Sequence, residues 1–419
     1  MSIILILIIL SITVWIKFNS RDIAAPDISN LSIQQVQIPD QENAYTYFHE
    51  AVDSLCWPQD DSLLSSILYK QTWDEDFVNE LLSKNQKTLD LIEKGLDCSV
   101  FEGPGDFMSD ENRPLFEIIN ISKLMAVRSV YELNKGKQQN AFQSCLNLFR
   151  LGSMLMAGNG GIMNFKLGLN SIDMACEQYR NLFAETALSE QMLLNLSEYL
   201  NTISIDEGMT TALKYDYQFW SDTINKVASG DLTDISETKP SSGTYSFHPN
   251  RTRTILADYY RDVIENIPLA YAELKLPDKM DISNHASNRF LLKARPNIIG
   301  RLILSLPQEP KKINDLFEIK CRIQSNLSAL QIIAACHLYE LKYGRTPDTL
   351  SALVPNFLEE IPRDPFDGKP FRYLQKEAII YSVGTDLIDT TGPTELPETQ
   401  FPVPLQTDDL IYTIHLLTE

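Results

Sequence analysis

One segment of the chain, residues 312–343, constrains the fold more than any other. Its apolar residues recur at intervals of three and four positions: Leu316, Ile319, Ile323, Leu327, Leu330, Ala334, Leu338 and Leu341. This spacing matches the turn of an α-helix, so it predicts one long helix with a single apolar face. Such a face must be buried against another element. Gly344 follows and is expected to end the helix.

The residues after Gly344 predict a small antiparallel sheet. In order, they offer a helix cap at Asp348, turns at Asp364-Pro365 and Asp367-Gly368, and strands at residues 370–374 and 378–383. We expect Tyr373 and Tyr381 to cover the apolar face of the long helix. Residues 311–419 are therefore predicted to form a long helix on a small antiparallel sheet.

Three ordered motifs punctuate this C-terminal region. They are Tyr343-Gly344-Arg345-Thr346-Pro347, then Ile361-Pro362-Arg363-Asp364-Pro365-Phe366 with Gly368, Pro370 and Tyr373, then Ile380-Tyr381-Ser382-Val383-Gly384 with Asp386. Their kind and order resemble the globular head of the type II secretion system major pseudopilin (protein G). That family has a YP turn, a P-x-DPWG turn and an S-x-G-x-DG loop in the same order. The resemblance implies a pseudopilin-like head in this part of the chain only.

The resemblance also implies a calcium site in the loop after the last strand. Calcium takes carboxylate, carbonyl and hydroxyl oxygens as ligands. In this chain we expect Asp386 and Asp389 to supply them, with Ser382 and Thr391 nearby. Leu387 stands where the family has a glycine, which changes the loop. The alternative is that both aspartates only make the hydrogen bonds of a turn.

The first residues predict a membrane anchor. Residues 3–16 are almost entirely apolar, and Lys17 follows them. As a helix, residues 3–18 would extend about 24 Å, slightly less than a hydrocarbon core of about 30 Å. A cleaved signal peptide is the alternative, but no basic residue precedes the apolar run. We predict an uncleaved transmembrane anchor at residues 1–18, followed by a polar stalk at residues 19–40.

Two observations disagree on the orientation of this anchor. Lys17 and Arg21 follow the apolar run, which would keep the body in the cytoplasm. The pseudopilin resemblance implies the opposite side, and we follow it. We therefore expect a single-pass protein of a bacterial inner membrane with an extracytoplasmic, periplasmic body. The start MSIILILIILSITVWIK departs from the family's leader and cleavage site, so packing into a pilus is not expected.

Residues 41–310 predict a helical domain. Its clearest hairpin lies at residues 114–156, where Asn134-Lys135-Gly136 is expected to end the first helix. This hairpin resembles a single tetratricopeptide unit, although such units need about three copies to bury their faces. The alternative is a generic helical hairpin. The predicted fold class is mainly α, with a helical-hairpin body and a C-terminal α+β pseudopilin-head-like module.

Charge and cysteine content narrow the class of protein. The 56 acidic residues outnumber the 36 Lys and Arg residues and give a net charge of −20, which argues against nucleic-acid binding. The six cysteines show neither CxxC nor zinc-site spacing, and we expect free thiols: Cys56, Cys98, Cys145, Cys176, Cys321 and Cys336. Only the disulfide status of Cys56 and Cys98 is left open.

Few residues suggest chemistry. His337 and Glu340 have the spacing of a helical metal pair, but packing or a surface pair is the expected role. Gly158-Asn159-Gly160-Gly161 lacks the Lys-Ser/Thr of a phosphate loop and predicts a turn between helices. His49-Glu50 has no nucleophile beside it, and His248 and His285 are expected in loops. We predict no catalytic and no cofactor-binding residue.

These observations predict a membrane-anchored envelope protein that is not an enzyme and acts as a scaffold through contacts with protein partners. One alternative is a calcium-dependent component of a type II secretion-like or surface assembly system. Another is a hydrolase with a cleft in the helical body. A concave pocket in residues 41–300 with convergent carboxylates or a histidine dyad would favour the hydrolase, whereas a flat apolar patch there would favour scaffolding.

Overall fold

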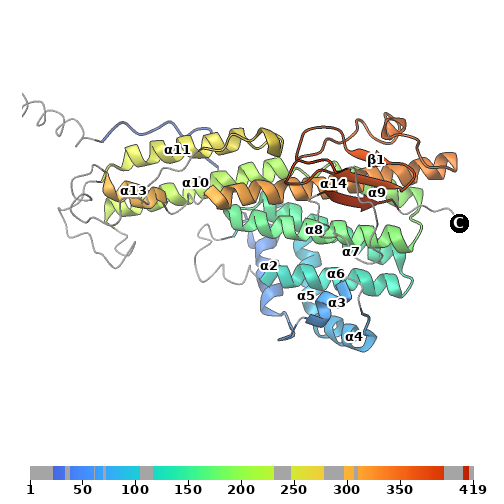
Figure 1. Ribbon diagram of the computed structural model, residues 1–419. Coiled ribbons are helices and arrows are strands. Elements are labelled where there is room, and N and C mark those ends of the chain that lie inside the picture. Colours follow the sequence, from blue (N-terminus) through green and yellow to red (C-terminus); the bar gives the residue numbers. More distant parts are fainter. Residues whose placement is uncertain are drawn as a thin grey trace, which may run out of the picture. The chain divides into compact units, whose positions relative to one another are not determined.

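The computed structural model describes residues 22–33, 38–60, 62–68, 72–103, 117–230, 247–277, 297–305, 310–390 and 409–414. This part of the chain is mainly helical and carries one small antiparallel sheet of three strands (Figure 1). The predicted mainly α fold class with a small sheet is therefore confirmed.

The described chain divides into two compact units. The first takes its residues from Met1–Gln35, Leu213–Asn266 and Lys275–Leu316, and the second takes them from Val36–Ala212, Ile267–Leu274 and Phe317–Glu419. Helices α10 (Ile205–Ser229) and α14 (Pro310–Tyr343) contribute residues to both units. The predicted division into domains at 41–310 and 311–419 stays a prediction.

The centre of the second unit is formed by three helices. These are α6 (Ile118–Asn134), α7 (Gln138–Ala157) and α8 (Gly161–Glu185), which pack against one another. The backbones of α7 and α8 approach closely at two glycines. A Cβ at Gly152 would lie 2.7 Å from the carbonyl oxygen of Gly168, and one at Gly168 would lie 2.5 Å from that of Gly152. Only glycine fits both positions without a shift of the helices.

The turn between α6 and α7 follows the predicted C-cap chemistry. Gly136 has a positive φ of 68°, its N–H donates to the Leu133 carbonyl at 2.8 Å, and the Lys137 N–H donates to the Glu132 carbonyl at 2.8 Å. This pair of bonds is a Schellman motif, which satisfies the last carbonyls of α6. The predicted helical hairpin is confirmed within the described residues.

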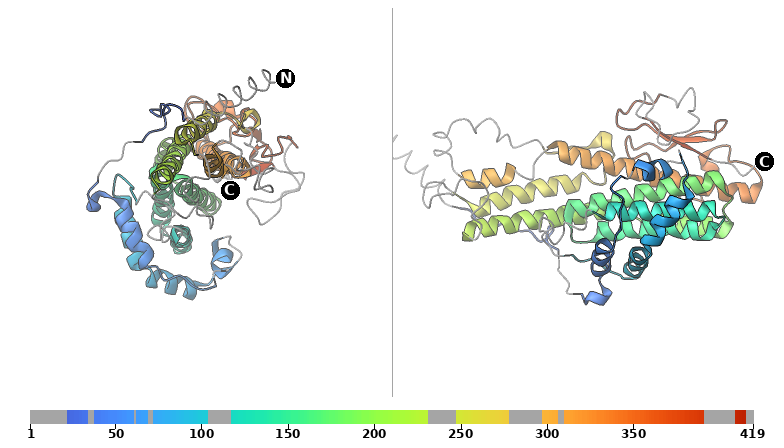
Figure 2. Two further views of the ribbon diagram at one scale, coloured as in Figure 1. Left: turned by 90° about the vertical axis from the view of Figure 1, so that its left-hand side faces the viewer. Right: turned by 90° about the horizontal axis from the view of Figure 1, so that it is seen from below.

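Short helices cover one side of the three-helix centre. They are α2 (Ala44–Asp53), α3 (Ser62–Leu68), α4 (Glu75–Lys84) and α5 (Gln86–Leu96). Helix α2 packs on α5, both α3 and α4 pack on α6, and α5 packs on α7. Figure 1 shows α2, α4 and α5 below α6–α8 in that view, with the sheet above, and Figure 2 gives two further views. Helix α9 (Glu190–Leu200) begins after Ser189, whose Oγ accepts from Met192 N at 3.3 Å.

The sheet has the order β1-β2-β3 and consists of β1 (Arg372–Leu374), β2 (Ile379–Ser382) and β3 (Leu410–Thr413). A short 3-10 helix, η5 (Leu350–Leu353), precedes it. The sheet region packs on α14: Cys321 clusters with Phe366 and Val383, and Tyr412 Oη donates to Asn326 Oδ1 at 2.7 Å. The long helix, the short helix and the first two strands match the prediction, whereas β3 was not predicted.

The register of β1 and β2 corrects one expectation. Arg372 pairs with Tyr381, and Tyr373 pairs with Ile380. Side chains alternate along a strand, so Tyr373 and Tyr381 lie on opposite faces of the sheet. Ile380 also pairs with Tyr412, whose hydroxyl reaches α14, so this face meets the helix. The expectation that Tyr381 covers the helix is therefore wrong.

The first unit contains α11 (Pro249–Glu265), which packs on α13 (Ile298–Ser305). Residues of α10 and α11 make one of its buried polar contacts. The Tyr260 hydroxyl of α11 donates to Asp216 Oδ2 of α10. Burial raises the pKa of the Asp216 carboxyl to about 6, because the charged form is poorly solvated.

The membrane predictions do not hold. Within the described ranges, no helix combines the length and apolar character that a bilayer crossing requires. A span needs about 20 predominantly apolar residues. This finding contradicts the predicted transmembrane helix and the predicted single-pass inner-membrane localisation. Residues 1–18, which include the predicted contact at 3–18, lie outside the described residues.

Candidate functional site

In the structure, the predicted calcium ligands form hydrogen bonds with different protein groups. The Ser382 hydroxyl, at the end of β2, donates to Asp364 Oδ1 at 2.8 Å. Asp386 Oδ1 accepts from the Ile388 N–H at 2.9 Å, which is the hydrogen bond of a turn. Thr391 lies outside the described residues.

Asp389 is bound by a guanidinium group. Its Oδ2 accepts from Arg372 Nε at 3.1 Å, and its Oδ1 accepts from Tyr381 Oη at 3.1 Å. The described ranges hold no group of three or more His, Cys, Asp and Glu side chains arranged to bind a metal ion. In this geometry the loop does not fit a calcium ion, and the calcium site stays a prediction from the resemblance alone.

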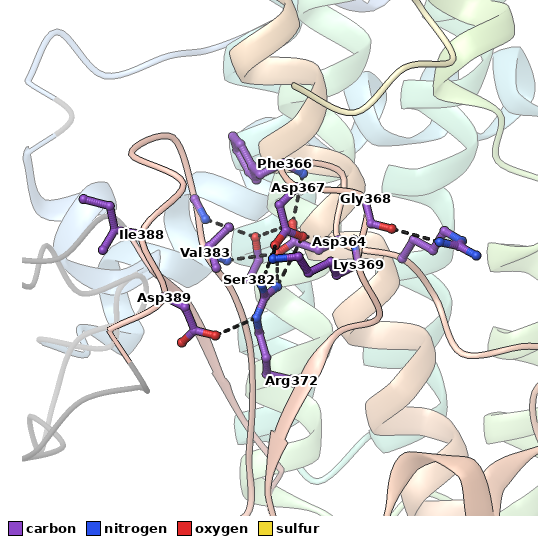
Figure 3. A network of polar contacts seen from close by, with 12 residues as sticks. Asp364, Phe366, Asp367, Gly368, Lys369, Arg372, Ser382, Val383, Ile388 and Asp389 are labelled. Carbon is purple, nitrogen blue, oxygen red and sulfur yellow. Dashed lines mark hydrogen bonds and ion pairs between the residues drawn. The ribbon is translucent and has the colours of Figure 1, made fainter. Parts of the chain in front are cut away.

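The Asp364 carboxylate is the centre of a polar network, shown in Figure 3. The residue is fully buried and begins the turn before β1. Its Oδ1 accepts from Phe366 N at 3.0 Å and from Ser382 Oγ at 2.8 Å. Its Oδ2 accepts from Val383 N at 2.9 Å and from Arg372 Nη1 at 2.8 Å. These four bonds join the turn, β1 and the end of β2.

Arg372 extends the network to a second aspartate of the same turn. Its Nη2 contacts Asp367 Oδ2 at 2.5 Å. Partial burial opposes ionisation of Asp367, but hydrogen bonds from Arg372 and from the Lys369 N–H outweigh it and lower the pKa of the carboxyl. Asp367 is therefore held as a carboxylate beside the guanidinium.

The remaining histidine and glycine candidates have packing roles. His337 and Glu340 are buried, and the His337 ring stacks on Phe183 with ring centres 4.8 Å apart. The glycine-rich segment forms the turn between α7 and α8, where Asn159 bonds both backbone groups of Gly103 at 2.8 and 2.6 Å. Both interpretations from the sequence are confirmed. His285 lies outside the described residues.

All six cysteines are free thiols. Cys56 is exposed and Cys98 is partly buried, and the other four are buried: Cys145, Cys176, Cys321 and Cys336. Burial raises the pKa of the Cys145 thiol to about 12, so this thiol is not reactive at neutral pH.

A cavity of about 190 Å³ lies in the second unit, between the helical body and β3. Residues of α3, α6, α8, α14 and β3 line it. Its charged and amide side chains come mainly from α8 and α14: Lys123, Asn170, Asp173, Glu177, Gln178, Arg180, Arg322 and Asn326. Sequence reasoning assigned none of these residues to a site. The available signal was the spacing of Asp173, Glu177 and Arg180, which places three charges on one side of the helix.

Arg180 is the most unusual residue of this cavity. Its side chain is 12% exposed, and its Nη2 pairs with Glu177 Oε2 at 2.5 Å. The guanidinium lies over the Tyr412 ring at 5.8 Å from the ring centre. Its Nε and Nη1 atoms are buried and have no hydrogen-bond partner in the described part of the chain. Buried donors of this kind are rare, because each forgoes its bond to water.

Asp173 and two neighbouring side chains form a short hydrogen-bonded chain at the same cavity. Tyr412 Oη donates to Asn326 Oδ1 at 2.7 Å, and Asn326 Nδ2 donates to Asp173 Oδ1 at 2.6 Å. Burial raises the pKa of Asp173, although the charges of Arg180 and Arg322 act against this rise. The carboxylate is thus oriented and is easier to protonate than an exposed one.

Asn170 offers the cavity an acceptor. Its Oδ1 atom is buried and has no hydrogen-bond partner among the described residues. Unpartnered donors on Arg180 and an unpartnered acceptor on Asn170 therefore line the same cavity.

A second cavity, of about 320 Å³, lies beside α14 and the Asp364 turn. Its charged groups are already engaged with the protein. Lys320 Nζ donates to the Ile267 carbonyl and pairs with Asp206 Oδ1 at 3.0 Å. Gln324 Nε2 also donates to Asp206 Oδ1, at 2.8 Å. The Arg180 cavity is therefore the better candidate for a ligand site.

Comparison of the chain with protein-family models, with curated proteins and with solved structures found no match. The functional argument therefore depends on the geometry of the described residues.

Proposed function

We propose that this protein binds a small organic anion, a carboxylate in particular, in the Arg180 cavity. The observation that carries the proposal is the pair of buried, unpartnered N–H groups on Arg180. A buried donor without a partner costs about 1–3 kcal/mol. A carboxylate oxygen can accept from either of these N–H groups, and such charge-assisted hydrogen bonds are strong.

The charges around the cavity support an anionic ligand. Three cationic side chains line it, from Lys123, Arg180 and Arg322, against the two carboxylates of Asp173 and Glu177. The raised pKa of Asp173 reduces the negative charge further as the pH falls. This positive balance is a local feature of a chain with a net charge of −20, so it concentrates anions at one place.

The size of the cavity limits the ligand to a small molecule. A cavity of about 150 Å³ is known to hold a benzene molecule, and the cavity here measures about 190 Å³. Part of its wall is apolar and would contact the hydrocarbon part of the ligand: Leu68, Ala126, Met174, Leu410 and Ile411. A short-chain or single-ring carboxylate meets both requirements.

The other predicted functions have less support. Scaffolding through protein partners and a role in a secretion-like assembly rest on the pseudopilin resemblance, and both stay predictions. A hydrolase in the helical body also stays a prediction. The cavity gives that body a concave site with carboxylates, but Glu177 is paired with Arg180.

The test is calorimetric titration of the full chain with acetate, succinate, glutamate and benzoate at constant ionic strength. We expect at least one of them to bind, and binding should weaken about tenfold or more in Asn170→Asp. This variant keeps the side-chain volume and adds a negative charge at the cavity, a change worth at least about 1.4 kcal/mol at that ratio.

The matched control is Arg345→Met, which removes an exposed arginine that pairs with Asp348 at 2.9 Å away from the cavity. This variant should bind the same carboxylate as the unmodified chain does. Absence of binding by all four compounds, or equal weakening in both variants, would contradict the proposal.

A further inference from the structure

We propose that Arg372 is the built-in cation of the C-terminal module and takes the place that a metal ion would have there. Under this proposal the module needs no calcium. The inference is independent of the Arg180 cavity, because it concerns different residues and a different kind of bond.

The first argument is geometric. The three nitrogens of the Arg372 guanidinium contact three carboxylates: Nη1 contacts Asp364 at 2.8 Å and Asp367 at 3.4 Å, Nη2 contacts Asp367 at 2.5 Å, and Nε contacts Asp389 at 3.1 Å. The three aspartates come from the turn before β1 and from the loop after β2 (Figure 3). A single cation thus joins two segments that approach each other only in the folded chain.

The second argument concerns the acceptors that remain. An ionised carboxylate has about four lone-pair sites, and Asp364 accepts four donors: Phe366 N, Ser382 Oγ, Arg372 Nη1 and Val383 N. This buried carboxylate has no site left for a metal ion. Ser382 and Asp389, two of the predicted calcium ligands, are bound to this same network.

The third argument is the fit of the cation. The side chain of Arg372 is only 15% exposed, so its guanidinium is mostly shielded from water. A planar guanidinium presents its donors in fixed directions, which matches three carboxylates spread around it. A calcium ion would instead need about 6–8 oxygens at 2.3–2.6 Å. The observed arrangement therefore suits the guanidinium and not the metal.

The experiment measures thermal unfolding of the full chain in millimolar calcium and in excess EDTA. We expect the same melting temperature in both, because the guanidinium already occupies the centre of the network. Arg372→Ala should melt several degrees lower in both solutions. Methylguanidinium at millimolar concentration should raise the melting temperature of this variant, and sodium chloride at equal ionic strength should not.

Arg345→Ala is the control, since it removes an exposed guanidinium that pairs with a single aspartate. It should melt close to the unmodified chain and show no response to methylguanidinium. Calcium-dependent melting of the unmodified chain would overturn the proposal, and so would an Arg372→Ala variant as stable as Arg345→Ala. If Arg372→Ala does not fold, the comparison of the unmodified chain in calcium and in EDTA still tests the proposal. Arg372→Lys then replaces Arg372→Ala, because lysine keeps the positive charge but lacks the planar set of guanidinium donors.

Discussion

Arg372 and Arg180 are the same side chain in two opposite states of bonding. Both are largely buried, with 15% and 12% of the side chain exposed. Arg372 uses all three nitrogens on carboxylates, whereas Arg180 pairs through one nitrogen and leaves Nε and Nη1 without a partner among the described residues. Burial alone therefore does not reveal the role of an arginine. The number of satisfied donors separates a structural cation from one with capacity for a ligand.

Asp216, in the first unit, shows what happens to a buried carboxylate without an arginine. It accepts from the Tyr260 hydroxyl, and burial raises its pKa to about 6. Asp367, beside Arg372, has a lowered pKa instead. The three sites therefore differ in kind. Arg372 has a carboxylate partner for each nitrogen, Arg180 has donors without a partner among the described residues, and Asp216 is a carboxylate that is protonated easily.

The largest effect is expected at Asp364. In Asp364→Asn the amide nitrogen faces hydrogen-bond donors, and Arg372 loses its most buried carboxylate. We expect the free energy of unfolding to fall by about 3 kcal/mol or more, as when one partner of a buried ion pair is removed. Urea unfolding of the full chain measures this. Asp389→Asn is the control: its side chain is 42% exposed, and the loss should stay below about 1 kcal/mol. Equal losses in both variants would remove the distinction.

The next effect is a pH dependence from Asp216. Its folded pKa of about 6 lies above the usual 3.8, so between these values the folded state binds more protons than the unfolded state. The stabilisation is complete below pH 3.8 and is lost as the pH rises through about 6. The difference corresponds to about 3 kcal/mol. Asp216→Asn does not titrate, so the stability difference between the two chains should change by this amount in urea unfolding. A constant difference from pH 4 to pH 7 contradicts it.

A smaller effect is expected in ligand binding at the Arg180 cavity. Protonation of Asp173 removes a negative charge beside Arg180 and Arg322, while Glu177 stays paired. Carboxylate affinity should therefore rise as the pH falls through the raised pKa of Asp173. We expect a change of roughly tenfold, about 1.4 kcal/mol, in calorimetric titrations. Asp173→Asn should bind with an affinity that is nearly independent of pH, and a slope as steep as that of the unmodified chain would refute the assignment.

The smallest effect on the free energy of unfolding is expected when Arg180 is replaced, and the same replacement of Arg372 provides the comparison. Arg180→Met removes a cation whose donors are incompletely used, and Glu177 keeps 19% exposure to water. We expect a change below about 1 kcal/mol in the free energy of unfolding, because the variant also removes two buried donors without partners, which offsets the loss of the ion pair with Glu177. Arg372→Met should lose several times as much in the same urea experiment. If Arg180→Met proved the more damaging, the interpretation of Arg180 as an open cation would be wrong.

Local patterns in the sequence predicted much of the fold. The apolar periodicity of residues 312–343 predicted α14, and Gly136 predicted the end of α6, because both signals depend on neighbours along the chain. Strand β3 was missed because it pairs with β2 across a long separation in sequence. The register that places Tyr381 away from α14 also depends on this pairing.

The candidate site was much harder to predict. Arg180, Asn326 and Tyr412 lie far apart in the sequence and meet only when α8, α14 and β3 pack. Whether a donor lacks a partner depends on tertiary packing, so the spacing of residues in the sequence does not predict it. Arg372 was overlooked for the same reason. The sequence motifs directed attention to Asp386 and Asp389, and the cation that binds Asp389 lies seventeen positions earlier.

The glycines at the contact of α7 and α8 have a consequence for exchange of backbone hydrogens with solvent. Where Gly152 and Gly168 bring the two backbones together, no side chain can swing aside to admit water. Helix α8 also carries Asp173, Glu177 and Arg180, so the wall of the Arg180 cavity is built on this contact. In deuterated water, the amides around these glycines should be among the last of the second unit to exchange. The cavity would then have one wall that stays closed while shorter elements around it open.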